Sequence, residues 1–163
     1  MIYTLLLAAL LAGTAGAPSV EQVFKKIATD PVPSCEAGHA EALTSGILTI
    51  KPDQIICTSV ESRGDSIVPV AVVSAYKPET TLVIKFWREP NSGDMYLVVF
   101  NPLGGFLQYQ AAMRLPGSLL PQHTSTCPVL SHRRGIERWP QPVEELVLSN
   151  FKLLPESESV SCQ

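Results

Sequence analysis

The stretch TTLVIKFWREPNSGDMYLVVF, residues 80–100, contains two apolar runs separated by EPNSGD. Pro, Asn, Ser and Gly favour turns, so this pattern predicts a β-hairpin. Side chains alternate between the two faces of a strand. In the first strand Leu82, Ile84 and Phe86 share one face, and Val83, Lys85 and Trp87 share the other. In the second strand Tyr96, Val98 and Phe100 lie opposite Met95, Leu97 and Val99.

Both faces of this hairpin are therefore apolar except at Lys85. A sheet exposed to water on one face would alternate apolar and polar residues. We therefore expect a cover on both faces, a facing sheet on one side and a terminal helix on the other. A pocket for an apolar ligand is the alternative cover.

The rest of the chain predicts further strands. Apolar or β-branched runs separated by turn formers lie at Ile47–Ile50, Ile55–Val60, Ile67–Ser74, Thr80–Arg88, Met95–Asn101 and Phe106–Met113. Regular spacing of this kind predicts an antiparallel sheet folded as a sandwich or barrel. Pro69 assigns its strand to an edge or a bulge. Gln108 and Gln110 alternate with apolar residues, so the sixth strand should be half-exposed.

Helices are predicted near both ends, which makes the fold class mainly β with terminal helices. Ser19 and Gln22 fit a capping box, and an amphipathic helix follows them until Pro31. In the tail, Pro142 and two glutamates precede apolar residues at helical spacing. We favour a helix there over a strand. Between Pro116 and Pro142 we expect a long ordered loop held by Cys127.

Residues 1–17, MIYTLLLAALLAGTAGA, carry no charged side chain and have a short apolar core. That core is too short to span a bilayer and is typical of a signal peptide. An uncleaved anchor or a buried N-terminal helix is the alternative. We therefore expect a secreted, extracellular protein without stable membrane insertion, in which residues 18–163 form a single β-rich domain.

The four cysteines are Cys35, Cys57, Cys127 and Cys162. An even number in a secreted chain predicts two disulfides. Among the three possible connectivities we favour Cys35–Cys57 with Cys127–Cys162, because short separations are encountered more often. No C-x-x-C or H-x-x-x-H spacing supports zinc, so we expect no metal site.

Charge and motifs exclude several functions. The 12 Lys and Arg residues and 15 Asp and Glu residues are spread along the chain, so we expect no nucleic-acid groove. The sequence contains no G-x-S-x-G, P-loop or H-E-x-x-H motif. The histidines His39, His123 and His132 are scattered. We expect a non-enzymatic protein without a cofactor, and a hydrolase is the weakest alternative.

Two groups of residues are candidate interaction sites. Arg133, Arg134 and Arg138 form the densest positive cluster, which would suit an acidic partner, a sulfated glycan or a processing protease; a solvated loop is the plain alternative. Trp87, Lys85 and Tyr109, with other tyrosines, would form an aromatic binding surface unless they complete the core.

The sequence also contains Arg63-Gly64-Asp65, the tripeptide of integrin ligands, but Gly-Asp is ordinary turn chemistry. Taken together, these features predict an interaction module such as an inhibitor, a matrix or coat component, or a surface ligand, with a protein or glycan partner. The alternative is a carrier that holds a small apolar ligand between the hairpin and a terminal helix.

Overall fold

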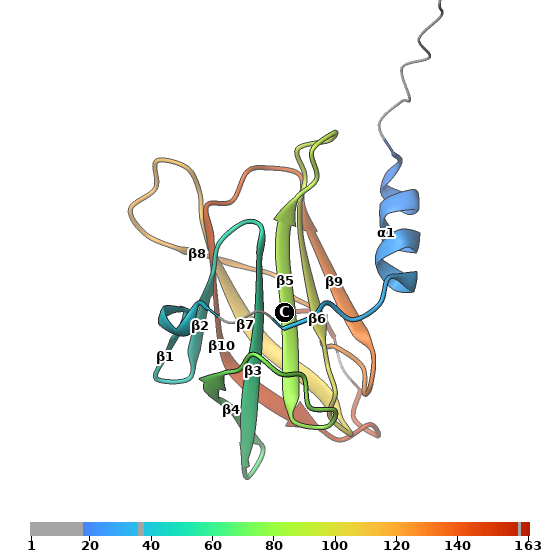
Figure 1. Cartoon of the computed structure of the whole chain (residues 1–163), viewed down its shortest axis with the longest axis vertical. Helices are drawn as coiled ribbons and strands as arrows, with labels where there is room; N and C mark the ends of the chain where they lie inside the picture. Colours follow the sequence, from blue (N-terminus) through green and yellow to red (C-terminus); the bar gives the residue numbers. More distant parts are fainter. Residues whose placement is uncertain (1–17, 36–37, 160) are drawn as a thin grey trace, which may run out of the picture.

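A computed structural model describes residues 18–35, 38–159 and 161–163. The predicted signal peptide, residues 1–17, lies outside the described residues. In the described part, a single α-helix stands beside one curved antiparallel sheet of ten strands (Figure 1). The elements are α1 Val20–Thr29, the short 3₁₀ helix η1 Ala40–Ala42, β1 Leu43–Thr44, β2 Ile47–Ile50, β3 Gln54–Arg63, β4 Ser66–Val72, β5 Thr81–Arg88, β6 Met95–Phe100, β7 Phe106–Arg114, β8 Gln122–Thr124, β9 Arg134–Trp139 and β10 Glu145–Leu154.

The predicted hairpin is confirmed as β5 and β6, which pair antiparallel with Lys85 opposite Val98. It lies centrally, because β3 pairs with β5 and β9 pairs with β6. Its inward side chains belong to the main core, which also receives residues from β2, β4, β7 and β10. Its outward side chains form a second cluster with Val23 and Ile27 of α1. The hairpin is therefore covered twice, by the rest of the sheet and by the N-terminal helix.

Helix α1 forms as its sequence predicts. The Ser19 hydroxyl accepts from the Gln22 amide at 3.2 Å, and the Gln22 side chain accepts from the Ser19 amide at 2.8 Å. This capping box supplies partners for amides that a helix N-terminus leaves unpaired. The helix ends at Thr29 because Pro31 disfavours helical backbone at Asp30, which is extended. Val23 and Ile27, one turn apart, are the buried residues on its sheet-facing side.

Two β-bulges help the sheet to curve. Pro69 lies at a register shift between β3 and β4, which confirms the predicted edge or bulge position. A second shift interrupts the pairing of β10 with β7 between Ser149 and Lys152, and Asn150 there has a φ of 53°. Bulges bend a strand and increase its twist. The sheet can thus turn far enough to enclose the main core.

The tail is a strand, β10, so the predicted C-terminal helix is wrong. Leu146 and Leu148 alternate inward as in any strand, and the bulge then makes Phe151 the next buried residue. The step from Leu148 to Phe151 is three residues instead of two. A step of three residues between buried positions also occurs in helices, and this is why the sequence favoured a helix. The pairing with β2, β4 and β7 shows that the segment is a strand.

The predicted loop between Pro116 and Pro142 is also corrected, because it contains β8 and β9. The inward positions of β9 are Gly135, Glu137 and Trp139, which do not form an apolar alternation. Position 135 requires glycine, because a Cβ there would collide with the side chain of Val129. Because this packing requires a glycine at an inward position, β9 lacks the apolar alternation that predicts a strand.

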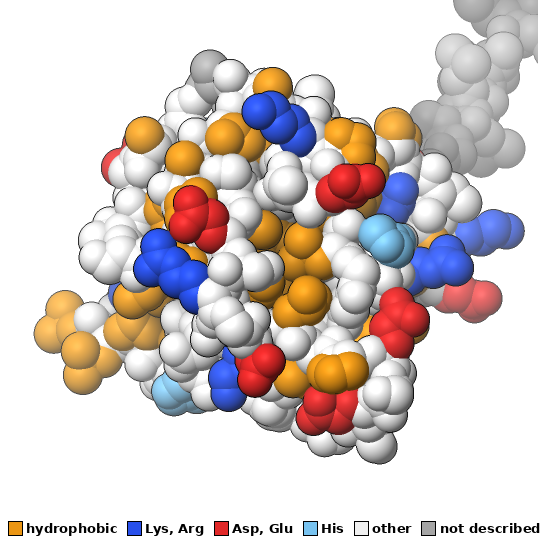
Figure 2. Space-filling model, turned by 90° about the horizontal axis from the view of Figure 1, so that it is seen from below, with side chains coloured by type: hydrophobic (Ala, Val, Ile, Leu, Met, Phe, Trp, Pro, Cys, Tyr) orange, Lys and Arg blue, Asp and Glu red, His pale blue; other side chains and the backbone are white. Residues whose placement is uncertain are grey.

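Both predicted disulfides are confirmed, Cys35–Cys57 and Cys127–Cys162. The first joins the segment after α1 to β3, and the second joins the C-terminal segment to the chain between β8 and β9. Positive and negative side chains are interspersed on the face shown in Figure 2, so that face carries no uniformly positive surface. Within the described ranges, no helix is both long enough and apolar enough to cross a membrane.

Candidate functional site

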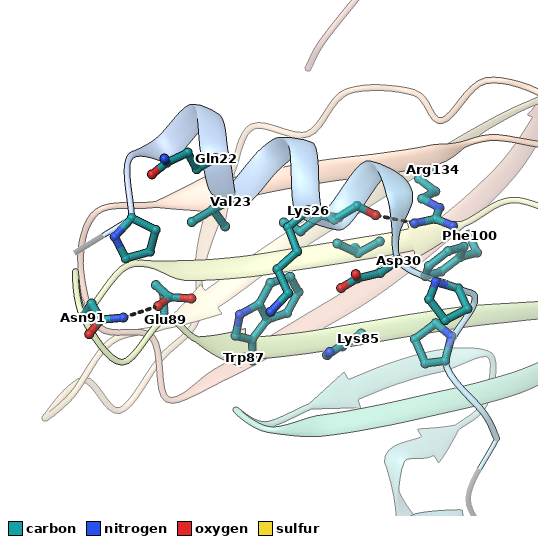
Figure 3. Close-up of a pocket in the computed structure, with 15 residues that line it drawn as sticks. Gln22, Val23, Lys26, Asp30, Lys85, Trp87, Glu89, Asn91, Phe100 and Arg134 are labelled. Atoms are coloured by element: carbon teal, nitrogen blue, oxygen red, sulfur yellow. Dashed lines mark hydrogen bonds between the residues drawn. The ribbon is translucent and has the colours of Figure 1, made fainter. Parts of the chain in front are cut away.

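A groove of about 740 Å³ separates α1 from the outward face of β5 and β6 (Figure 3). One wall is the helix, which contributes Val23, Lys26 and Ile27. The floor is the hairpin, which contributes Lys85, Trp87, Val98 and Phe100. Gln22 and Asn91 line one end, Phe100 and Arg134 line the other, and Pro18, Pro31 and Pro33 complete the lining. Because α1 touches the sheet through few buried side chains, the space beside those contacts is open.

The floor is mainly apolar and aromatic, with Lys85 as the charged residue among its four side chains. The indole of Trp87 stacks on Tyr96, with ring centroids 5.4 Å apart and planes 20° apart. Phe24 of α1 meets the same tyrosine edge-on at 6.0 Å. Tyr96 is itself buried, and burial raises the pKa of its hydroxyl. The stack packs one face of the Trp87 indole against Tyr96, so this floor residue has an aromatic partner within the protein.

The groove also carries charge. Lys85 lies with its Nζ 5.0 Å from the centroid of the Trp87 ring. Arg134 of β9 donates to the carbonyl oxygen of Ile27, near the end of α1, and its guanidinium lies 4.7 Å from the centroid of Phe100. Lys26 reaches down from the helix toward the floor (Figure 3). Asp30 and Glu89 are the acidic groups that line the groove.

The candidate interaction residues separate in the structure. Lys85 and Trp87, two positions apart on β5, meet Arg134 from β9 in the groove. Arg133 is exposed in the turn before β9. Arg138 is held by Asp94, with 2.8 Å between Nε and Oδ2, and this hydrogen bond raises the pKa of the guanidinium. Arg138 therefore stands apart, whereas Arg133 and Arg134 both line a second hollow beside the turn.

Tyr109 is not a surface residue, and its assignment as a candidate interaction residue is wrong. It lies inward on β7, is 1% exposed and stacks on Phe151 with centroids 5.9 Å apart. Burial raises the pKa of its hydroxyl well above the ordinary range. Gln108 and Gln110 occupy the outward positions of the same strand, which confirms that β7 is half-exposed. Alternation along β7 thus directs the tyrosine into the core.

Other features from the sequence lie elsewhere. Arg63-Gly64-Asp65 forms the exposed turn between β3 and β4, with Gly64 at a φ of 65°. The histidines stand in separate elements: His39 precedes η1, His123 is in β8 and His132 is in the turn before β9. Within the part of the chain that the structure describes, no three His, Cys, Asp or Glu side chains form a group that could hold a metal ion.

Sequence reasoning missed Lys26, Asp30 and Phe100 as groove residues. Lys26 lies in the last turn of α1, and Asp30 follows four residues later as the C-cap of the helix. That spacing alone does not show which strand the helix covers. The groove depends on three segments, α1, the β5–β6 hairpin and β9, which only the folded chain brings together.

Replacing Arg134 with Met should loosen α1. The substitution removes a charged donor from a helix-terminal carbonyl, an interaction worth about 1 to 2 kcal/mol. We expect the amides of α1 to exchange with solvent about tenfold faster, as measured by hydrogen exchange. Arg133→Met is the matched control, because Arg133 is exposed and makes no such bond. Equal exchange in the two variants would contradict this role of Arg134.

No protein-family model, curated protein sequence or solved structure matches this chain, so its function has to be inferred from the groove and the fold alone.

Proposed function

We propose that this is a secreted, non-enzymatic binding protein that carries a small molecule in the groove between α1 and the hairpin. The observation that supports this proposal is the groove itself. Its volume of about 740 Å³ falls in the range of about 300–1,000 Å³ found for small-molecule sites. Its floor is apolar and aromatic, and a few polar groups surround it, which is the usual composition of such sites.

The tight packing of the main core also supports the outward groove as the ligand site. The core residues are packed to very low exposure, with Leu97, Leu107 and Leu146 each 0% exposed. A ligand on the outward face leaves that packing undisturbed, because it needs only the space beside α1. The two disulfides suit an oxidising compartment, as expected of a protein released from the cell.

Native mass spectrometry on protein purified from its own secretion tests the proposal. We expect a native mass that exceeds the denatured mass by that of a small molecule. We also expect Val98→Trp to lose this increment, because Val98 lies on the groove floor and is 2% exposed. Overpacking of this kind lowers the free energy of unfolding by about 1 to 3 kcal/mol. This is less than the free energy of about 5 to 15 kcal/mol that stabilises a typical domain, so urea denaturation should show that the variant is folded.

Two controls complete the experiment. Leu130→Trp places the same large side chain at an exposed position outside the groove and should keep the ligand. Trp87→Ala, which widens the groove without filling it, should weaken retention. A folded Val98→Trp variant that still carries the ligand would exclude the groove as the binding site.

An interaction surface is a second candidate function, because one observation favours it. A smaller hollow of about 380 Å³ lies beside the turn that carries His132 and Arg133, and Tyr76, 42% exposed, contributes to its lining. An exposed arginine near an aromatic ring is typical of protein contact sites. Arg133→Glu should then abolish capture of an acidic partner. Arg134 should be left intact in that test, because it supports α1.

A further inference from the structure

We infer that the groove selects an amphipathic anion, a single apolar chain or ring system with a carboxylate, sulfate or phosphate headgroup. The apolar part lies on Trp87 and Val98, and the headgroup lies between Lys26 and Lys85. This inference rests on the proposed function, since it names the ligand class of the same site.

Lys85 is the strongest reason. It is the one charged residue between Thr81 and Trp87 in the central strand β5, where its neighbours on both faces are apolar. Strands buried in this way normally carry continuous β-branched or aromatic residues. Lys85 is half-buried and lines the groove opposite α1. Partial burial of a charge is unfavourable unless a partner compensates it.

Asp30 and Glu89 line the same groove, but among the described residues neither forms an ion pair within 4.0 Å with Lys26 or Lys85. Among the described side chains, the ion pairs within 4.0 Å involve His39, Arg63, Arg114 and Arg138, and neither Lys26 nor Lys85 takes part in one. Lys85 instead lies over the face of Trp87. Figure 3 shows Lys26 and Lys85 entering the groove from opposite walls, the helix and the sheet. An anionic headgroup between them would contact both.

The charge is unevenly distributed along the groove. Glu89 lies at the end near Gln22 and accepts a hydrogen bond from Asn91 at 3.1 Å. Lys26, Lys85 and Arg134 lie in the middle and toward the opposite end, where Asp30 is the acidic residue. The cations there exceed the carboxylates by two. The C-terminus of α1, which carries partial negative charge, also faces this end, and Arg134 offsets it by binding the Ile27 carbonyl.

The dimensions favour a small amphiphile over a larger lipid. Gln22 and Asn91 lie at one end of the groove, and Phe100 and Arg134 lie at the other. Its apolar floor spans two strands, which suits one chain or one ring system. Phe100 and Trp87 flank Val98 on this floor, so the apolar part of the ligand would lie between two aromatic side chains.

Three probes of equal chain length test the inference: dodecanoate, dodecan-1-ol and dodecyltrimethylammonium, each below its micellar concentration. They are titrated by calorimetry into the mature protein after extraction of bound lipid. We expect dodecanoate to bind at least tenfold more tightly than the alcohol, and the cationic probe to bind most weakly. The preference for dodecanoate should decrease in 1 M salt, because screening weakens partly exposed charge pairs.

The Lys85→Met and Lys26→Met variants locate the headgroup. Each keeps a long apolar side chain, so affinity for dodecan-1-ol should be unchanged while affinity for dodecanoate falls about tenfold. Lys25→Met is the matched control, because Lys25 is exposed on α1 and does not line the groove. It should leave both affinities unchanged, and quenching of Trp87 emission, absent in Trp87→Phe, confirms where the probes bind.

The outcomes separate the two proposals. If dodecan-1-ol and dodecanoate bind equally, the groove is an apolar site and the inference of anion selectivity is wrong, while the proposed function stands. Tighter binding of the cationic probe would also overturn the inference. If none of the three probes binds to the folded protein, the proposed function fails together with the inference.

Discussion

Replacing Cys35 and Cys57 with serine should remove α1 from the sheet and abolish ligand binding in the groove, while the sheet itself remains folded. The disulfide closes a separation of 22 residues. In the chain-entropy model a loop of that size contributes about 3 kcal/mol to stability. The bond also joins the segment after α1 to β3, so its loss has a local effect in addition to the global one.

The local effect follows from the size of the helix. Helix α1 has ten residues, and isolated helices shorter than about 12–15 residues are marginal in water. Only Val23 and Ile27 are buried on its sheet-facing side. Without the tether, only these side chains, the edge of Phe24 on Tyr96 and the hydrogen bond from Arg134 to the Ile27 carbonyl would hold the helix. We expect its amides to lose protection from hydrogen exchange before the amides of β5 and β6.

The second disulfide is the matched control. Cys127–Cys162 closes a separation of 35 residues, so its removal should cost a similar free energy, about 3 to 4 kcal/mol. It lies away from α1 and does not border the groove. The Cys127→Ser, Cys162→Ser variant should therefore keep ligand binding at temperatures where it is folded. Equal loss of binding in the two variants would mean that binding reports overall stability and not the position of α1.

Phe86→Ala should be among the most destabilising single substitutions in the sheet. Phe86 is 0% exposed, faces the main core and packs edge-on against Trp139 with centroids 6.4 Å apart. Truncating a buried phenylalanine to alanine typically costs about 3 to 5 kcal/mol, because it leaves a cavity that neighbouring side chains cannot fill. Urea denaturation measures the loss as a lower midpoint at an unchanged slope.

The neighbouring residue gives the contrast. Trp87 lies on the other face of β5, is half-buried and lines the groove. Trp87→Ala should cost less, because water reaches part of the side chain and the stack on Tyr96 contributes about 0.5 to 1.5 kcal/mol. It should instead weaken ligand binding, which Phe86→Ala should not do while that variant is folded. A reversal of these two effects would contradict the assignment of the faces.

The position of the groove bears on how such a protein could control its ligand. The groove lies outside the curved sheet, and one of its walls is a helix attached through a disulfide and a few side chains. Under the proposed function, access to the ligand would depend on α1 and not on any change in the main core. The Arg134→Met variant described above should release ligand faster for this reason, without altering the stability of the sheet by a comparable amount.

Local sequence was sufficient for the features whose causes are local. The capping box and Pro31 define α1, turn formers separate β2 to β7, and alternation assigns the two faces of the hairpin. The two disulfide pairings followed from sequence separation. Residues 95–100 are apolar without interruption, which predicted a cover on both faces of this strand. The structure has that cover, since the main core buries one face of β6 and α1 packs against the other.

Tertiary packing decided the remaining features. The bulge at Asn150 gave β10 a helix-like spacing, and the side chain of Val129 required a glycine within β9, so both strands were hidden from periodicity. Tyr109 was assigned to the surface by residue type, but its position on β7 directs it inward. The groove unites Lys26, Lys85 and Arg134 from three segments, and no local pattern encodes their proximity. Long-range contacts of this kind are set by how the sheet curves and where the helix docks, which neighbouring residues in the sequence do not specify.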